Sequence, residues 1–143
     1  MSLLQRLYPS FPAGRAGAAL LIVRAFAGVA LMHHGWSKIQ NPFHWMDRAP
    51  GAAPAPLQFL AALSEFGGGL ALIAGLATPL AAFGVLCTMA VAVARHVSHG
   101  DPFVGRNHSW ELAGVYLTVA LALILSGPGA YSLDAAIARA RDR

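Results

Sequence analysis

Residues 24–38 read RAFAGVALMHHGWSK, an apolar run that begins at an arginine and ends in two histidines, a glycine and a lysine. If this run crosses a membrane, Arg24 is a charge at a depth where charges are costly. Such a residue usually faces a partner or a water-filled cavity rather than lipid. We therefore expect the other helices to supply a polar partner or a water-filled cavity for Arg24.

The composition of the whole chain favours a lipid bilayer as its environment. Hydrophobic residues make up 57% of the 143 residues and charged residues only 11%, against about 25% charged in an ordinary soluble domain. This length fits a single membrane domain over residues 1–143. The net charge is +4, but the ten lysines and arginines are scattered rather than clustered, so we expect no nucleic-acid partner.

Four apolar segments predict four membrane-spanning helices. They cover residues 16–35, 57–77, 79–97 and 110–126. At 1.5 Å per residue, runs of about 17 to 21 residues reach about 25 to 31 Å, which matches the hydrocarbon core of a bilayer. The second and third segments are joined only through Thr78 and Pro79, which predicts an antiparallel hairpin with Pro79 in the first turn of its helix.

The predicted fold is an all-α bundle of four transmembrane helices with a short amphipathic tail over residues 134–143. Ser132 or Asp134 would cap this tail. The connection 36–56 contains four prolines and is not expected to continue as a helix, and the connection 98–109 is a polar turn. Because no small-residue cleavage site closes the first run, we expect the first helix to be retained.

The predicted topology places both termini on one side of the membrane and the two longer connections on the other. Five basic residues lie on the terminal side and four on the other side. The positive-inside rule then favours cytoplasmic termini by a thin margin.

The six histidines all fall at helix ends or connections on the non-terminal side. Helical spacing puts Arg24 on one face with Gly28 and Gly35, with His34 on the flank and His33 on the opposite side, so we expect His34 to point inward. In the second span, Glu65 lies on a face of small residues that lets membrane helices approach closely. Glu65 is the predicted partner of Arg24.

The remaining spans bring further polar residues toward the same interior. We predict a cluster near the non-terminal surface, with His34, Arg95 and Glu65 as catalytic residues and Arg24, Lys38, His99 and Glu111 as ligand-binding residues. In the competing interpretation, the pairs Arg24–Glu65 and Arg95–Glu111 only hold the helices in register. For Lys38 and Arg48 a contact with lipid headgroups is the preferred interpretation.

A metal site is a weaker hypothesis. His96 and His99 are three residues apart, and His108 and Glu111 repeat the spacing, as metal ligands on bundle helices do. A transition metal or haem held by these four residues ranks below a quinone as the expected cofactor. The chain has no HExxH, no GxSxG and no phosphate-binding glycine loop, which argues against a zinc protease, a serine hydrolase and a nucleotide site.

Several short motifs together cover nearly the whole chain. They are Arg24 with Gly28, HGWSK at 34–38, EFGGG at 65–69 with Gly75 and Thr78, and the closing GPGAYSLD at 127–134. In these motifs the chain resembles the DoxX family of small four-helix membrane proteins, whose ending reads GPGxxSLD.

The resemblance implies a four-helix bundle in a bacterial inner membrane and a loose link to redox chemistry, since relatives include a subunit of thiosulfate:quinone oxidoreductase and partners in oxidative-stress complexes. It does not define a reaction for this chain. Cys87 is the only cysteine and cannot cycle as a dithiol.

Three functions follow as hypotheses, and the status of the chain as an enzyme stays open among them. The leading one is a redox-associated membrane protein whose cluster binds a quinone-like, small anionic or carbonyl-bearing ligand, with His34 and Arg95 donating hydrogen bonds to its oxygens. The second is a non-enzymatic scaffold or accessory subunit whose loops dock a protein partner. The third, transport, is weakened by the lack of an inverted sequence repeat, although a homo-oligomer formed through Gly67, Gly68 and Gly69 would supply symmetry.

Overall fold

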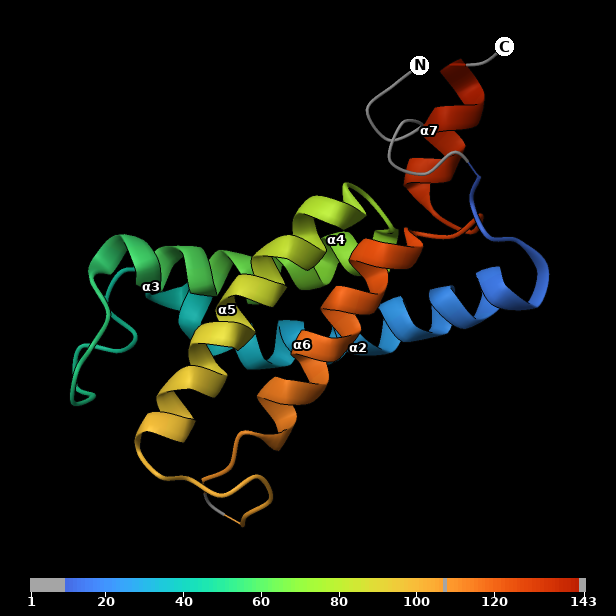
Figure 1. Cartoon of the computed structure of the whole chain (residues 1–143). Helices are drawn as coiled ribbons and strands as arrows, with labels where there is room; N and C mark the ends of the chain where they lie inside the picture. The colour runs from blue at the N-terminus through green and yellow to red at the C-terminus, as the bar shows by residue number, and fades with distance from the viewer. Residues whose placement is uncertain (1–9, 107, 142–143) are drawn as a thin grey trace.

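The computed structural model describes residues 10–106 and 108–141, and within these ranges all regular structure is helical (Figure 1). This confirms the predicted all-α class. The elements are α2 (Gly14–Gln40), α3 (Ala55–Ala62), the π-helical turn η1 (Leu63–Gly67), α4 (Gly68–Ala74), α5 (Thr78–Ser98), α6 (Glu111–Ser126) and α7 (Leu133–Arg141).

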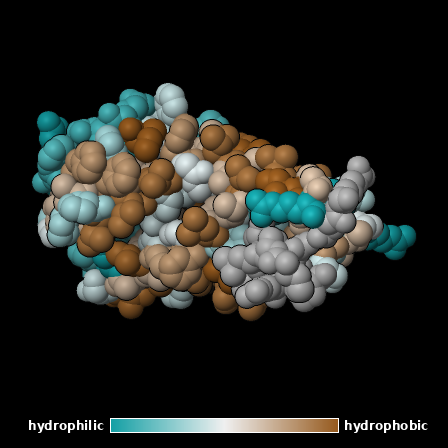
Figure 2. All heavy atoms as spheres, turned by 90° about the horizontal axis from the view of Figure 1, so that it is seen from above, coloured by the Kyte–Doolittle hydropathy of each residue, from teal (hydrophilic) through white to brown (hydrophobic). Residues whose placement is uncertain are grey.

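All four predicted apolar segments are helices, and three of them have the length and composition to cross a membrane. These are α2, the continuous unit Ala55–Ala74 and α5, with 27, 20 and 21 residues. The fourth, α6, has 16 residues and is about 24 Å long at 1.5 Å per residue. Large side chains such as Phe26, which is 80% exposed, point outward from this bundle. Hydrophobic residues dominate the middle of the face drawn in Figure 2, as lipid contact requires.

The first helix is longer than predicted, because it continues through residues 36–40, which were expected to begin the connection. Nothing in these residues breaks a helix. The first breaker is Pro42, whose ring disfavours helical geometry in the preceding residue, and Asn41 accordingly leaves the helical region with φ −138°. Lys38 is therefore a helical residue rather than a loop residue.

The predicted hairpin of the second and third spans is confirmed. The helix α4 ends at Gly75, whose φ of +66° allows a left-handed C-cap. After a turn of three residues, α5 begins at Thr78 with Pro79 in its first turn. Within the second span, the π-helical turn places Glu65 in its middle.

The helices α2 and α4 run antiparallel and touch through glycines. A Cβ atom on Gly28 would come within 2.6 Å of the carbonyl oxygen of Gly69, and one on Gly69 within 2.7 Å of the carbonyl oxygen of Gly28. Gly68, in turn, packs toward Val85 of α5. Two of the three glycines proposed for a homo-oligomer, Gly68 and Gly69, are therefore used within the chain, whereas Gly67 meets only Leu63 of its own span.

Both ends of the described chain meet at one end of the bundle. The Ala130 amide donates to the Pro12 carbonyl oxygen at 2.8 Å, so the segment before α7 lies against the chain that leads into α2. The tail forms α7, as predicted through Arg141, while the last two residues lie outside the described ranges. The Ala135 amide donates to Ser132 Oγ at 3.1 Å, which makes Ser132 the cap of this helix.

Candidate functional site

Arg24 does not pair with Glu65, and this central prediction is wrong. Its guanidinium is fully buried and donates to two backbone carbonyl oxygens, from Nη1 to Leu72 at 2.9 Å and from Nη2 to Tyr131 at 2.7 Å. Glu65 lies instead against Gly35. Gly35 is eleven residues further along α2 than Arg24, or about 16 Å away.

Arg24 belongs to a latch at the terminal end, which we define as Arg24, Gly75 and Asp134. A Cβ atom at Gly75 would collide with the Arg24 guanidinium. The buried Asp134 carboxylate accepts hydrogen bonds from the amides of Ala77 and Thr78 at 2.8 and 2.9 Å. Asp134 therefore caps α5 rather than its own helix, and the closing motif fastens the last segment to the hairpin turn.

The partner of Glu65 is Lys38. The Lys38 ammonium donates to both carboxylate oxygens of Glu65 at 2.6 Å, and the exposed fraction is 23% for the Lys38 side chain and 4% for Glu65. The ammonium also lies 4.7 Å from the centre of the Trp45 ring, a cation–π distance. Lys38 thus points inward, and its expected contact with lipid headgroups is wrong. A π-helical turn of the kind that holds Glu65 is frequent at functional sites.

Gln58 fastens the connection between α2 and α3 over this ion pair. Its buried amide accepts from the Met46 amide and donates to Asp47 Oδ1, each at 2.8 Å. The Trp45 indole returns a bond to the Gln58 carbonyl oxygen at 2.9 Å. Sequence reasoning missed Gln58, although an amide inside the apolar run PLQFLAAL was a usable signal, because a buried amide needs partners.

Asp47 is held in its charged form by this arrangement. A hydrogen bond from Gln58, and after it a hydrogen bond with His44, lower the pKa of the Asp47 carboxyl below its ordinary value. Asp47 is otherwise exposed. The Asp47 carboxylate therefore helps to order the connection between α2 and α3.

Arg95 ties the same connection to α5. Its Nη1 donates to the Gly51 carbonyl oxygen at 2.9 Å, and its Nη2 donates to that of Pro50 at 3.2 Å. The suggested pair of Arg95 with Glu111 is therefore wrong. Arg95 is thereby held against the connection and lines the same cavity as Lys38 and Glu65.

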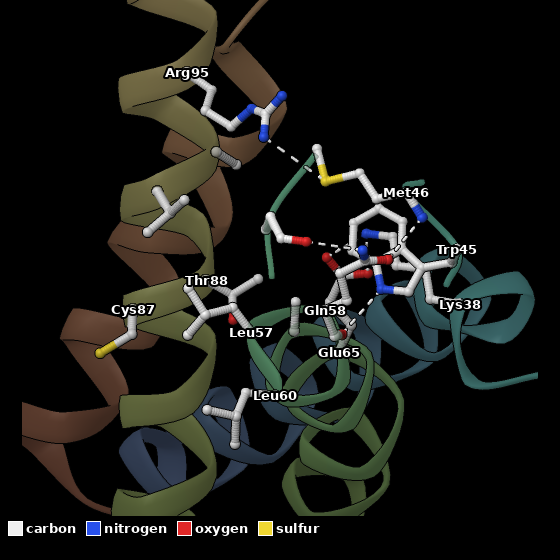
Figure 3. Close-up of a pocket in the computed structure, with 14 residues that line it drawn as sticks. Lys38, Trp45, Met46, Leu57, Gln58, Leu60, Glu65, Cys87, Thr88 and Arg95 are labelled. Atoms are coloured by element: carbon white, nitrogen blue, oxygen red, sulfur yellow. Dashed lines mark hydrogen bonds and ion pairs between the residues drawn. The ribbon is translucent and has the colours of Figure 1, made fainter. Parts of the chain in front are cut away.

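A first cavity of about 280 Å³ lies between the connection, α3 and α5. Figure 3 shows Lys38, Gln58 and Glu65 together at one end of it, Arg95 apart from them on α5, and Leu60 and Cys87 away from the ion pair. Its described lining residues include, at the polar end, Lys38, Gln58, Glu65 and Arg95, and along the apolar walls Leu57, Leu60, Cys87 and Val91. Of the three predicted catalytic residues, Glu65 and Arg95 meet here.

A second cavity, of about 180 Å³, also contains Lys38 and Glu65 in its lining. His34 is among its described lining residues and His33 is not, although both residues are exposed. The His34 ring packs edge-on against Tyr116 with 6.0 Å between ring centres. The third predicted catalytic residue therefore lies beside Glu65 but in a different cavity from Arg95.

The remaining predicted residues are not brought together. His99, His108 and Glu111 are exposed, and none is among the described lining residues of either cavity. His96 lines the second cavity and bonds Asp101 at 2.7 Å. Across residues 10–106 and 108–141, no three His, Cys, Asp or Glu side chains are grouped so that they could hold a metal ion. The four predicted metal ligands thus do not form a centre.

A comparison with protein-family models matches residues 19–98 to the family described as DoxX, which is more than half of the chain. The match contains all the residues that line the first cavity. Neither the curated proteins nor the solved structures contain a match to the chain.

Proposed function

The chain belongs to the DoxX family of membrane proteins, and from this premise we propose that its first cavity binds a quinone-like ligand inside the membrane. The observation that carries the proposal is the division of one cavity into apolar walls and a polar end (Figure 3). Ligand sites commonly combine a mostly apolar lining with a few polar groups that orient the ligand. A prenylated quinone has the same division, with carbonyl oxygens on its ring and an apolar tail.

The charges at the polar end favour a neutral ligand with carbonyl oxygens over an anion. Lys38 already shares its charge with Glu65, so an added anion would face a carboxylate as well as an ammonium. Arg95 has five N–H donors in all, and its bonds to the connection leave some of them free for a ligand. Lys38 and Arg95 are the proposed hydrogen-bond donors, while His34 stands on the other side of the pair.

In this proposal the chain binds and orients the quinone, and a protein partner that carries a redox group supplies or accepts electrons. The lone Cys87 gives the chain no dithiol of its own. This joins the redox-associated hypothesis to that of an accessory subunit. A bacterial inner membrane and cytoplasmic termini belong to the same proposal, and the excess of arginines on the terminal side supports the orientation.

Cys87 offers a test in the unmodified chain, because it is exposed and lines the cavity. The rate of its alkylation by N-ethylmaleimide would be measured in nanodiscs with increasing decylubiquinone, whose fully substituted ring resists addition of a thiol. We expect saturable protection of several fold. Decanol serves as the matched control for partition of an apolar chain into the bilayer.

Two variants connect protection to the polar end. Arg95→Gln and Lys38→Met are expected to weaken it, whereas His99→Gln, on an exposed residue of the same region, should leave it unchanged. Equal protection by decanol, or no protection at any quinone concentration, would refute the proposed ligand.

A further inference from the structure

Lys38 and Glu65 line both cavities, and we propose that this ion pair is a partition between a lipid-side chamber and a water-side chamber. The first cavity admits the ligand from the bilayer. The second admits water, and with it protons, to the same pair from the non-terminal surface. This inference rests on the proposed function and adds a second entrance to its site.

The first cavity opens sideways. Cys87 lies eleven residues before the end of α5 at Ser98, or about 16 Å along the helix, and is nevertheless exposed. Leu60 and Val91, which line the same cavity, are 55% and 61% exposed. An opening at this depth and with these walls faces hydrocarbon in a bilayer.

The second cavity extends from Leu31 and Met89, each nine residues before the end of its helix, up to the helix ends. His96 is two residues before the end of α5, and His34 is in the last two turns of α2. Ser109 lies two residues before the start of α6, and Leu112 is the second residue of α6. His96 is bonded to Asp101 of the polar connection. The lining of this entrance therefore continues into the part of the chain that leaves the membrane.

The second cavity also has the chemistry to hold water. Four polar side chains line it beside the ion pair: His34 from α2, His96 from α5, Tyr116 from α6, and Ser109 just before α6. Its volume of about 180 Å³ accommodates several water molecules. One buried water molecule needs a cavity of about 10 to 15 Å³ and two to four polar partners. Water there reaches Glu65 without crossing the apolar walls of the first cavity.

Thiol labelling in nanodiscs distinguishes the two chambers. The native Cys87 reports on the first chamber, and Ala113→Cys in a Cys87→Ser background reports on the second, which Ala113 lines. A permanently charged methanethiosulfonate is expected to modify the Ala113→Cys thiol at least ten times faster than Cys87. The neutral N-ethylmaleimide should reduce this difference or reverse it. Phe26→Cys in the same Cys87→Ser background, at an exposed apolar position, gives the labelling rate for a thiol that faces lipid.

If Ala113→Cys does not fold, Leu112→Cys probes the mouth of the same cavity. Equal labelling of Cys87 and the second-chamber thiol by the charged reagent would overturn the proposal, as would a second-chamber rate no higher than that of Phe26→Cys. The proposed ligand fails separately, when decylubiquinone does not protect Cys87 while the difference in labelling persists.

Discussion

Replacing Lys38 by methionine removes the ammonium that bonds both oxygens of Glu65. The Glu65 side chain is 4% exposed, so its charge would stay buried without a partner. Breaking a buried ion pair from one side costs about 3 to 5 kcal/mol. Glu65→Gln should cost less, about 1 to 2 kcal/mol, because the remaining Lys38 is partly exposed and keeps its contact with the Trp45 ring.

The double variant Lys38→Met with Glu65→Gln contains neither charge and is expected within about 1 kcal/mol of the unmodified chain. The free energies of unfolding of all four proteins would be measured in one detergent, by circular dichroism against increasing dodecyl sulfate. His99→Gln, at an exposed site, should change the free energy by no more than about 0.5 kcal/mol. The reasoning fails if Lys38→Met is no worse than Glu65→Gln, or if the double variant loses the sum of the two single losses.

Three further predictions concern the latch and the connection. Asp134→Ala removes the cap of α5 and should cost about 2 kcal/mol in the same unfolding assay, whereas Asp134→Asn, which keeps one acceptor, should lose about half as much. Gly75→Ala is expected to destabilise the chain by at least 1 kcal/mol more than Gly51→Ala, because both glycines have φ +66° but only at Gly75 does the new Cβ meet a buried guanidinium. Since the pKa of Asp47 is lowered chiefly by Gln58, its stabilising effect is complete above its ordinary value of about 4 and is lost as the pH falls through the lowered value. Tryptophan fluorescence should therefore report a loosening of the connection only below about pH 4, and a transition near neutral pH would contradict this assignment.

The helices could be predicted because their signals are local. Apolar runs of the right length marked all four segments, and Pro79 marked the start of α5. The end of α2 was placed too early because residues 36–40 are less apolar than the run before them. A helix that leaves a membrane has no need to end at the interface, and this one continues to Gln40, two residues before Pro42. Hydropathy finds the membrane boundary, and a breaker finds the helix boundary.

The site was predicted in part, because periodicity gives the side of a helix but not the depth of its partner. Arg24 and Lys38 lie on similar sides of α2, so either of the two cations could be the partner of Glu65. Which of them forms the ion pair depends on how far α4 is displaced along α2. Contacts of Gly28 with Gly69 and of Gly35 with Glu65 set this displacement, and only close approach of the backbones at these glycines decides it.

The depth of Arg24 follows from where α4 ends. Arg24 is ten residues from the terminal end of α2 at Gly14, and Glu65 is nine residues from the end of α4 at Ala74, so the two would lie nearly level if these helix ends coincided. They do not, because α2 extends past the hairpin turn and the closing segment packs on the extension, with Tyr131 close to Gly17. At that step the carbonyl oxygens of Ala71 and Leu72 accept from the turn amides of Leu76 and Gly75 at 2.9 and 3.1 Å, and each carbonyl oxygen can accept a second bond. Arg24 links this step to the closing segment, since one guanidinium donates both to Leu72 at the end of α4 and to Tyr131 just before α7. Arg24 is thus explained by a helix that ends inside the bundle, and it takes no part in the ion pair about 16 Å away, where we place the proposed ligand.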